Sequence, residues 1–352
     1  MSNIIHERPG VYSSYDASSV IRGGRTARVV GVAAKSAAGT ANKPVRLTSY
    51  AAGVKAFGED PAGTPGMSAL LRLLYLNGAT TVVAVPVDGT NYADAFAALE
   101  AEESVRIVIC DSGEAAVHTA LKSSVERASA ARRERVAVVG MAGAAPDALT
   151  ERAGELNSER MVLVGPDCLD SQGGTLTGVF AAAAVAGIVA SGSDSAVPIN
   201  GVRLEGLGGV QTQYDDNQID LLVRGGVTPL EAAGGQVSPV RGITTRSSTG
   251  GAADAAWREL TTILIVDDVI PSIRQSLRSR FCRTKNTVQT RGAIRSQVIV
   301  ELESKLRAQL IDSYGDVTVA LDESDPTVCL VEFSFAVAHG LNQIYLTAHI
   351  TI

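Results

Sequence analysis

The sequence predicts an α/β domain with a largely parallel sheet, then an α+β domain, with an extended arm at each end of the 352 residues. Short β-branched runs alternate with helical segments between residues 104 and 190, which is the pattern of a parallel sheet covered by helices. Beyond residue 190 glycines become frequent, and strands and helices stand in separate runs. We therefore expect four parts, at residues 1–22, 23–195, 196–340 and 341–352.

Residues 1–22 predict an N-terminal arm. The stretch ERPGVYSSYDASSV has a Pro-Gly turn, small polar residues and no helical periodicity. Terminal segments of this kind are ordered only when another surface ties them down. Flexible residues are expected at 17–24, where the arm joins the body.

The α/β domain is predicted from buried strands that alternate with amphipathic helices. Strands are expected at 27–34, 43–49, 80–87, 105–110, 135–140 and 160–165. Helices are expected at 50–58, 66–79, 114–133, 146–157 and 176–190. Ser49 is expected to cap the first helix, and Gly78 to end the second. The Ala-rich run 176–190 is too short to cross a bilayer and indicates a buried helix.

The α+β domain begins with a glycine-rich stretch that holds one short helix, capped by Asp215 or Asp216 and stopped by Gly225. Two strands are expected next, within 236–246 and 258–268. A helix at 271–281, with Pro271 in its first turn, precedes a second helix at 294–313. Strands at 315–321 and 326–338 complete the domain.

The last twelve residues, LNQIYLTAHITI, alternate apolar and polar side chains as a strand does. The apolar side is formed by Ile344, Leu346, Ala348, Ile350 and Ile352. Two partners fit such a strand. It can pair with 327–338 as a hairpin through HGLN at 339–342, or it can pair with a sheet of another subunit. In the second case 339–342 is the expected flexible link.

Composition excludes several classes of function. The net charge of −6 argues against general nucleic-acid binding. The four cysteines form no CxxC motif, so neither structural zinc nor a disulfide framework is expected, and a reducing cytoplasm fits. The N-terminus shows no secretory h-region, and no apolar run is long enough for direct membrane insertion.

A search for catalytic motifs finds no GxxxxGK[ST], GxGxxG, HExxH or GxSxG pattern. Asp111 follows one predicted parallel strand and Gly140 ends another, and α/β enzymes place functional groups at these strand ends. A helix N-cap is the favoured interpretation of Asp111, and close strand–helix packing that of Gly140. We expect neither a cofactor nor a metal. A soluble α/β enzyme with an unusual site near these two residues is the competing hypothesis.

Residues 271–300 carry many basic side chains and no Asp or Glu. The candidates for contact with a partner are Arg274, Arg278, Arg280, Arg283 and Lys285. Arg274 and Arg278 lie one helical turn apart, beside an apolar stripe of Ile273, Leu277 and Phe281. A solvated face explains the pattern, and so does a face that meets an acidic partner. Nucleic acid ranks third, since aromatic residues are scarce there.

Several stretches taken together resemble contractile tail sheath proteins of phages and phage-tail-like bacteriocins. The order of matching stretches is the specific signal, since none is decisive alone. The N-terminal matches are RPGVY at 8–12, the segment 27–58 and LLRLLYLNGATTVVAVPV at 70–87. The later matches are AAVAGIVASGSDSAVPINGVRLEG at 183–206, LVRGGVTPLE at 222–231, VRGITTR at 240–246 and the segment 259–281.

The resemblance implies a structural subunit and no enzyme. Sheath subunits of this family stack as six-fold rings around an inner tube, on a baseplate and below a terminator protein. They contract from a metastable extended state and drive the tube through a cell envelope. It implies that 23–195 is the outer domain, with a variable part at about 88–190, and that 196–340 lies next to the tube.

The resemblance also implies that both arms donate strands to neighbouring subunits. The N-terminal residues concerned are Arg8, Pro9, Gly10, Val11 and Tyr12, and the C-terminal ones are the five apolar residues of 344–352. It implies assembly in the bacterial cytoplasm and release as part of a tail or tail-like particle. The related sheath of a type VI secretion-like apparatus is a further alternative. There the sheath consists of two chains, whereas here one chain carries both arms.

Overall fold

The computed structural model describes residues 28–342, and these divide into two compact units. The α/β unit comprises residues 28–193, 197–261 and 340–342. The C-terminal unit comprises residues 194–196 and 262–339. The division differs from the predicted boundary at residue 195, because 197–261 joins the α/β unit through backbone contacts. Thr245 N, for example, donates to the Met161 carbonyl over 2.8 Å.

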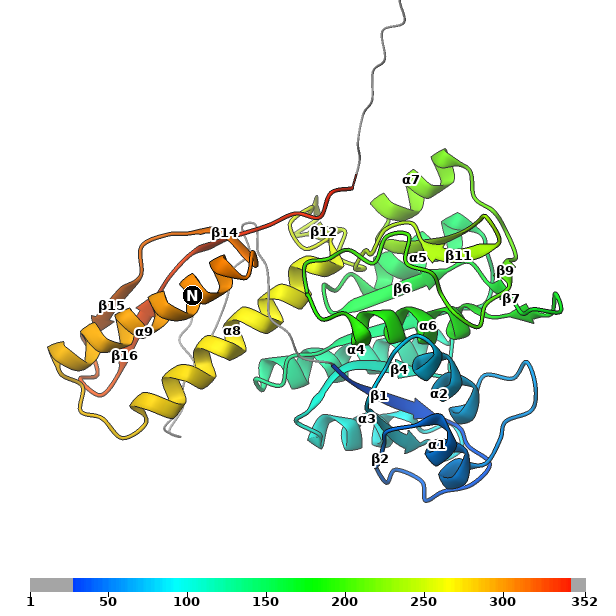
Figure 1. Ribbon diagram of the computed structural model, residues 1–352, viewed down its shortest axis with the longest axis horizontal. Helices are drawn as coiled ribbons and strands as arrows, with labels where there is room; N and C mark the ends of the chain where they lie inside the picture. The colour runs from blue at the N-terminus through cyan, green and yellow to red at the C-terminus, as the bar shows by residue number, and fades with distance from the viewer. Residues whose placement is uncertain (1–27, 343–352) are drawn as a thin grey trace, which may run out of the picture. The chain divides into compact units, whose positions relative to one another are not determined.

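The α/β unit is built on an eight-stranded sheet in the order β11-β10-β6-β5-β4-β1-β3-β2 (Figure 1). Its six inner strands are parallel: β1 Val29–Ala34, β3 Val82–Pro86, β4 Val105–Cys110, β5 Val136–Gly140, β6 Met161–Gly165 and β10 Val227–Ala233. The antiparallel strands β2 Val45–Leu47 and β11 Gln236–Pro239 form its edges. The predicted largely parallel sheet is confirmed.

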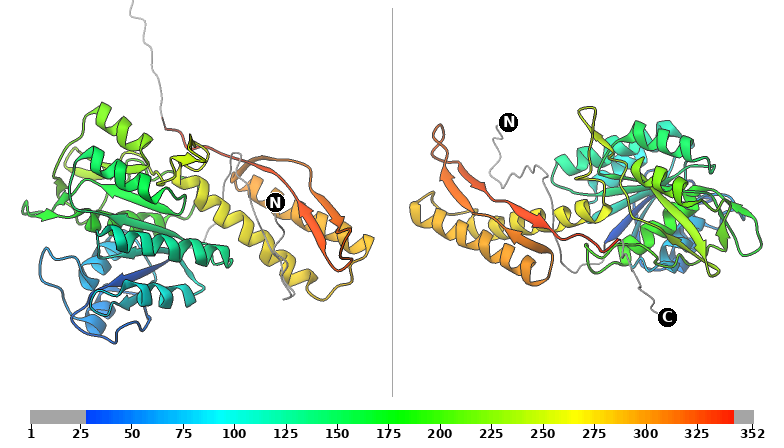
Figure 2. Two further views of the ribbon diagram at one scale, coloured as in Figure 1. Left: turned by 180° about the vertical axis from the view of Figure 1, so that it is seen from behind. Right: turned by 90° about the horizontal axis from the view of Figure 1, so that it is seen from above.

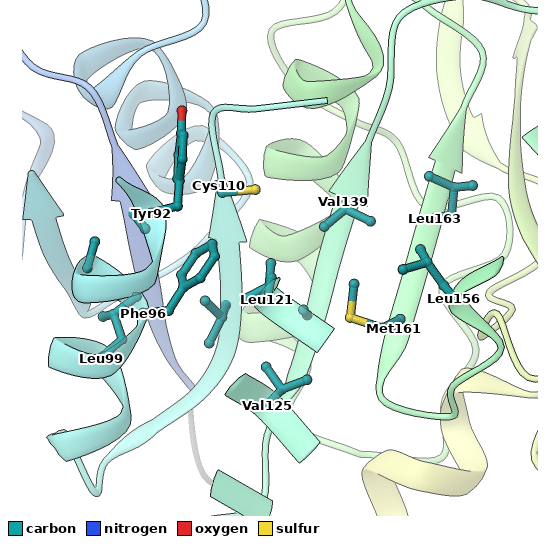
Figure 3. Close-up of a cluster of buried hydrophobic side chains, with 14 of the residues drawn as sticks. Tyr92, Phe96, Leu99, Cys110, Leu121, Val125, Val139, Leu156, Met161 and Leu163 are labelled. Carbon is teal, nitrogen blue, oxygen red and sulfur yellow. The ribbon is translucent and has the colours of Figure 1, made fainter. Parts of the chain in front are cut away.

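Helices cover both faces of this sheet, as both views of Figure 2 show. One face carries α3 Tyr92–Ala101, α4 Ala115–Ala130, α5 Pro146–Leu156 and α7 Asp216–Arg224. Against the other lies α6 Gly178–Ser191, followed by α2 Met67–Leu76 and α1 Tyr50–Phe57. Figure 3 shows how Phe96, Leu121 and Leu156 from three helices meet the strand residues Val139 and Leu163 in one buried core.

Local signals explain where these helices begin and end. Ser49 accepts a hydrogen bond from Ala52 N and caps α1, and Gly78 follows α2 with φ of 91°. Asp215 forms a capping box with Gln218 at the start of α7. Helix α6 is buried from Gly178 to Ala190, as its Ala-rich sequence predicts.

Short strands occupy the connections of the α/β unit. Strands β7 Cys168–Leu169, β8 Thr175–Leu176 and β9 Gly209–Val210 form a small sheet, and β12 Ser248–Thr249 pairs with β13 Ala252–Ala253. The loop 201–204 donates to the backbone of β11, from Gly201 N to Pro239 O and from Leu204 N to Val237 O, each over 2.8 Å. This loop therefore covers one edge of the main sheet.

The C-terminal unit combines two helices and two pairs of strands. The helices are α8 Leu260–Phe281, which belongs to this unit from Thr262 onward, and α9 Val288–Arg307. The strands are β14 Ile311–Tyr314, β15 Thr318–Leu321, β16 Cys329–Glu332 and β17 Phe335–Val337. Helix α8 contributes a buried stripe of Ile265, Val269, Ile273 and Leu277, which meets Val298 and Leu302 of α9.

The prediction of a strand at 258–268 is wrong, because this segment forms the first half of α8. Its β-branched run TTILIVDDVI is typical of a strand, but Ile265 and Val269 continue the helical stripe of Ile273 and Leu277. Pro271 therefore lies inside a 22-residue helix rather than in a first turn. Beside it, Ser272 Oγ donates to the Asp268 carbonyl over 2.6 Å.

Candidate functional site

The four strands of the C-terminal unit follow one another as a single two-stranded ribbon, residues 311–337. Strand β14 pairs antiparallel with β17, and β15 pairs antiparallel with β16. Between the two pairs, Gly315 N donates to the Ser334 carbonyl over 2.9 Å. In Figure 2 the ribbon runs along α9, which contacts β14 and β15.

One face of the ribbon lies against the helices and the other is open to solvent. Val319 and Val331 are opposite each other and belong to the apolar cluster with α8 and α9. The next pair along, Ala320 and Leu330, alternates to the other face and is exposed. Phe333 and Phe335 stack with ring centroids 6.0 Å apart. The ribbon thus has a buried side and a partly apolar free side.

Each strand of the ribbon has only one strand partner within residues 28–342. An isolated two-stranded ribbon is marginally stable in water, and three or more strands are the usual minimum. Open edges also attract further strands, which is why most proteins cover or charge them. The ribbon therefore offers strand edges that an added strand could pair with.

The basic residues predicted to face a partner lie in this unit. Arg278 and Arg280 are exposed on the last turn of α8, and Arg283 and Lys285 are exposed on the loop after it. Arg274, one turn earlier, is half-buried and engaged within the protein. Arg280 donates to Gln297 of α9, whose amide donates to Ser276 over 2.8 Å. The exposed charges therefore gather at one end of the helix pair.

A second polar contact links α8 to α9 further along. Lys305 Nζ lies 2.7 Å from Asp268 Oδ1 and 3.0 Å from Ser272 Oγ. Both charged side chains are mostly shielded from water. A shielded pair of this kind fixes the register of two helices, since any shift would leave a charge without its partner.

The carboxyl end of the main sheet holds the residues that the enzyme hypothesis requires. Asp111, buried at the end of β4, accepts from Lys35 N over 2.8 Å and from Tyr92 Oη over 2.7 Å. It does not cap α4, whose N-cap is Glu114, so the expected N-cap role is wrong. Burial raises the pKa of Asp111, while these two donors oppose the rise.

Gly140 provides close packing between strand and helix, as its sequence context predicts. A Cβ atom there would overlap the Gly178 carbonyl at the start of α6. The sequence interpretation did not include Asp167, which accepts from Gly178 N over 2.7 Å and from Gly143 N over 2.8 Å. Its position just after a buried strand, like that of Asp111, was the available signal. Both carboxylates thus join loops to the sheet.

The described residues hold no group of three His, Cys, Asp or Glu side chains placed to bind a metal ion. No helix within 28–342 is both long and apolar enough to cross a membrane. The arm residues 8–12 and the strand residues 344–352 lie outside the described part of the chain. Their predicted contacts with neighbouring subunits are therefore not tested by the structure.

Residues 86–245 match the phage tail sheath protein central domain, and residues 252–351 match the phage tail sheath C-terminal domain. The tail sheath protein of Bacillus phage SP01 is 30% identical over 270 residues, which cover 75% of this chain and 46% of that protein. The chain thus spans about half the length of this curated relative. The matches define a tail sheath fold, and the chain belongs to the phage tail sheath family.

Solved structures with the same fold include sheath assemblies. The contracted helical sheath of the anti-feeding prophage matches with a TM-score of 0.72 and 16% identity, over 98% of this chain and 99% of that one. The contracted PVC sheath of an extracellular contractile injection system gives 0.71 and 14%, over 99% of each chain. A sheath tail protein from Desulfitobacterium hafniense gives 0.71 and 14%, over 94% and 100%. At these identities the likeness concerns the fold.

Proposed function

We propose that this chain is the structural subunit of a helical contractile sheath around an inner tail tube. Strands donated from both termini link neighbouring subunits, and the lattice contracts from a metastable extended state to drive the tube through a cell envelope. Its partners are further copies of itself, six to a ring, together with the tube, baseplate and terminator proteins. Assembly takes place in the bacterial cytoplasm, before release in a tail or tail-like particle.

The ribbon is the observation that carries this proposal. Within the described chain it presents strand edges without a strand partner and a partly apolar free face. A donated strand supplies both the backbone hydrogen bonds and the alternating side chains that such an edge lacks. The alternation of residues 344–352 and the segment around Val11 and Tyr12 supply one candidate strand for each edge.

The terminal strand can supply enough free energy for a durable link. Its four large apolar residues, Ile344, Leu346, Ile350 and Ile352, each contribute roughly 1.5–3 kcal/mol when buried, or about 6–12 kcal/mol together. The cost of association reduces this gross value. A link of this size keeps subunits joined while their folded bodies rotate during contraction.

The basic end of the helix pair is proposed to face the tube. The exposed charges of Arg278, Arg283 and Lys285 suit a contact that forms by electrostatic attraction and breaks when the sheath contracts. Arg274 and Arg280 complete the proposed surface. An interface of charges on a rim dissociates more readily than a continuous apolar one.

Deletion of residues 344–352 tests the proposal. The deleted protein is expected to remain folded and monomeric, whereas the intact chain forms hollow tubes or rings in negative-stain microscopy. Uniform small particles from the intact chain would favour the enzyme hypothesis instead. If the truncated monomer unfolds, the strand belongs to the subunit's own core, as a hairpin with 327–338 would require.

A further inference from the structure

The last described residues of the chain, 340–342, lie on the α/β unit rather than on the C-terminal unit that precedes them. We name this segment the root, because residues 343–352 leave from it. The sequence suggested that 339–342 is a flexible link. Residues 340 and 342 instead contact two residues of the loop after α6, Pro198 and Asn200.

Gly340 fits closely against Pro198. A Cβ atom on residue 340 would overlap Pro198 Cγ and would come within 3.0 Å of its Cδ. Gly340 is not among the glycines with positive φ, so its backbone conformation does not require glycine. The absence of a side chain is needed here for space alone, which marks a tight and specific contact.

Asn200 binds the root through its amide. Its Nδ2 donates to Asn342 Oδ1 over 2.9 Å, and its Oδ1 accepts from Gly242 N over 3.2 Å. Gly242 is itself tied to the start of α8, since its carbonyl accepts from Leu260 N over 3.1 Å. Asn200 therefore connects the root to a fixed part of the α/β unit across 142 residues of sequence.

These contacts leave only a short connecting segment between the root and the terminal strand. Only Gln343 separates Asn342 from Ile344, the first residue of the apolar alternation. Two extended residue steps span about 7 Å at most. A strand that begins at Ile344 must therefore start pairing within that distance of the root.

We propose that Pro198 and Asn200 hold residues 340–342 as a fixed root that positions residues 344–352 for pairing with the ribbon of a second copy of this chain. The root fixes the start of the donated strand to the α/β unit of its own subunit. This proposal rests on the strand donation of the proposed function. Pro198 and Asn200 act as positioning residues, since they do not enter the donated strand.

Substitution of Gly340 tests the root, and a second substitution is designed to restore it. Gly340→Ala introduces the Cβ that overlaps Pro198, and the double variant with Pro198→Ala removes the overlapped atoms. We expect Gly340→Ala to raise the protein concentration needed for polymerisation by about tenfold or more, measured by sedimentation and negative-stain microscopy. The double variant should polymerise as the original protein does.

Two controls accompany these variants. Pro198→Ala alone should polymerise normally, as should Gly154→Ala, a glycine substitution in the same unit with nothing within 4 Å of the added Cβ. The unfolding temperature of unassembled Gly340→Ala should match that of the original protein. If the unfolding temperature of Gly340→Ala falls, Asn342→Ala becomes the test of the root. This exposed residue can lose its amide contact without disturbing the core.

Normal polymerisation of both Gly340→Ala and Asn342→Ala would overturn the fixed root and support a flexible link. Failure of the Pro198→Ala rescue, with the monomer intact, would also contradict it. Deletion of residues 344–352 distinguishes a failure of the root from a failure of strand donation. If the protein that lacks 344–352 polymerises normally, strand donation itself is wrong. If that protein alone fails to polymerise, strand donation holds and the fixed root does not.

Discussion

His118 is expected to make the stability of the α/β unit depend on pH. The imidazole is fully buried on α4, and its Nε2 lies 3.0 Å from the Ser112 carbonyl, which requires the proton on Nε2. Nδ1 is buried without a hydrogen-bond partner among the described residues. The substitution His118→Gln keeps an amide donor for the carbonyl but removes the group that titrates.

The size of the effect follows from the pKa of His118, which burial lowers from 6.5 to about 4, with a further contribution from the nearby charge of Arg152. Between these two values the unfolded chain binds a proton that the folded chain does not. Stability is therefore complete above pH 6.5 and is lost as the pH falls towards 4. At about pH 4.5 the loss amounts to roughly 2.5 kcal/mol of the free energy of unfolding.

Urea unfolding of unassembled protein measures this loss. The single tryptophan, Trp257, lies in the same unit as His118 and serves as the fluorescent reporter. Acidic residues titrate in both proteins, so the difference between the original protein and His118→Gln isolates the histidine. That difference should move by roughly 2.5 kcal/mol in favour of the variant between about pH 7.5 and pH 4.5.

Parallel pH curves for the two proteins would refute this reasoning. They would mean that His118 takes up a proton in the folded state as readily as in the unfolded state, and so that its ring reaches water or an acidic partner.

Two further predictions concern the sheet and the basic surface. Gly140→Ala forces α6 away from β5, because the added Cβ overlaps the Gly178 carbonyl, and should lower the free energy of unfolding by about 3 kcal/mol or more. Gly154→Ala, whose Cβ meets nothing within 4 Å, is the matched control, and equal melting temperatures for the two variants would contradict the close contact. Charge reversal to Glu at three exposed positions should prevent assembly on tubes while leaving the monomer folded, as judged by co-sedimentation and circular dichroism. These positions are Arg278, Arg283 and Lys285, whose side chains are exposed. Normal tube-bound assembly would exclude this surface as the tube contact.

The parallel sheet was predictable because each strand's own residues carry the signal. Strands β4, β5 and β6 are short apolar runs buried on both faces, and each is followed by a helix with a recognisable start or stop. The Ala-rich helix α6 was predictable for a similar reason. Where local propensity and burial agree, the sequence pattern is sufficient.

In helix α8, local propensity and burial favour different structures. Its first half reads as a β-branched strand, and only the packing of Ile265 and Val269 beside Ile273 makes it helical. The division between units was missed for a related reason. Thr245 Oγ1 donates to the Ser158 carbonyl over 3.0 Å, and contacts of this kind hold 197–261 on the rest of the α/β unit without any periodic signal.

The segment HGLN at 339–342 was predicted as flexible because a donated strand needs a flexible join to the body of its subunit. Glycine at 340 instead allows close contact with Pro198, and the asparagine at 342 binds Asn200. A single sequence does not distinguish a glycine needed for freedom from one needed for space. The open edges of the ribbon could not be predicted either, because the sequence pattern of a strand does not indicate how many other strands it pairs with.

A reconstruction of the assembled polymer by cryo-electron microscopy is the most direct test of strand donation between subunits. We expect the ribbon at residues 311–337 to gain strands along its open edges, one of them being 344–352 of a neighbouring subunit. A ribbon that remains two-stranded in the polymer, or a strand 344–352 that folds back onto its own subunit, would contradict it.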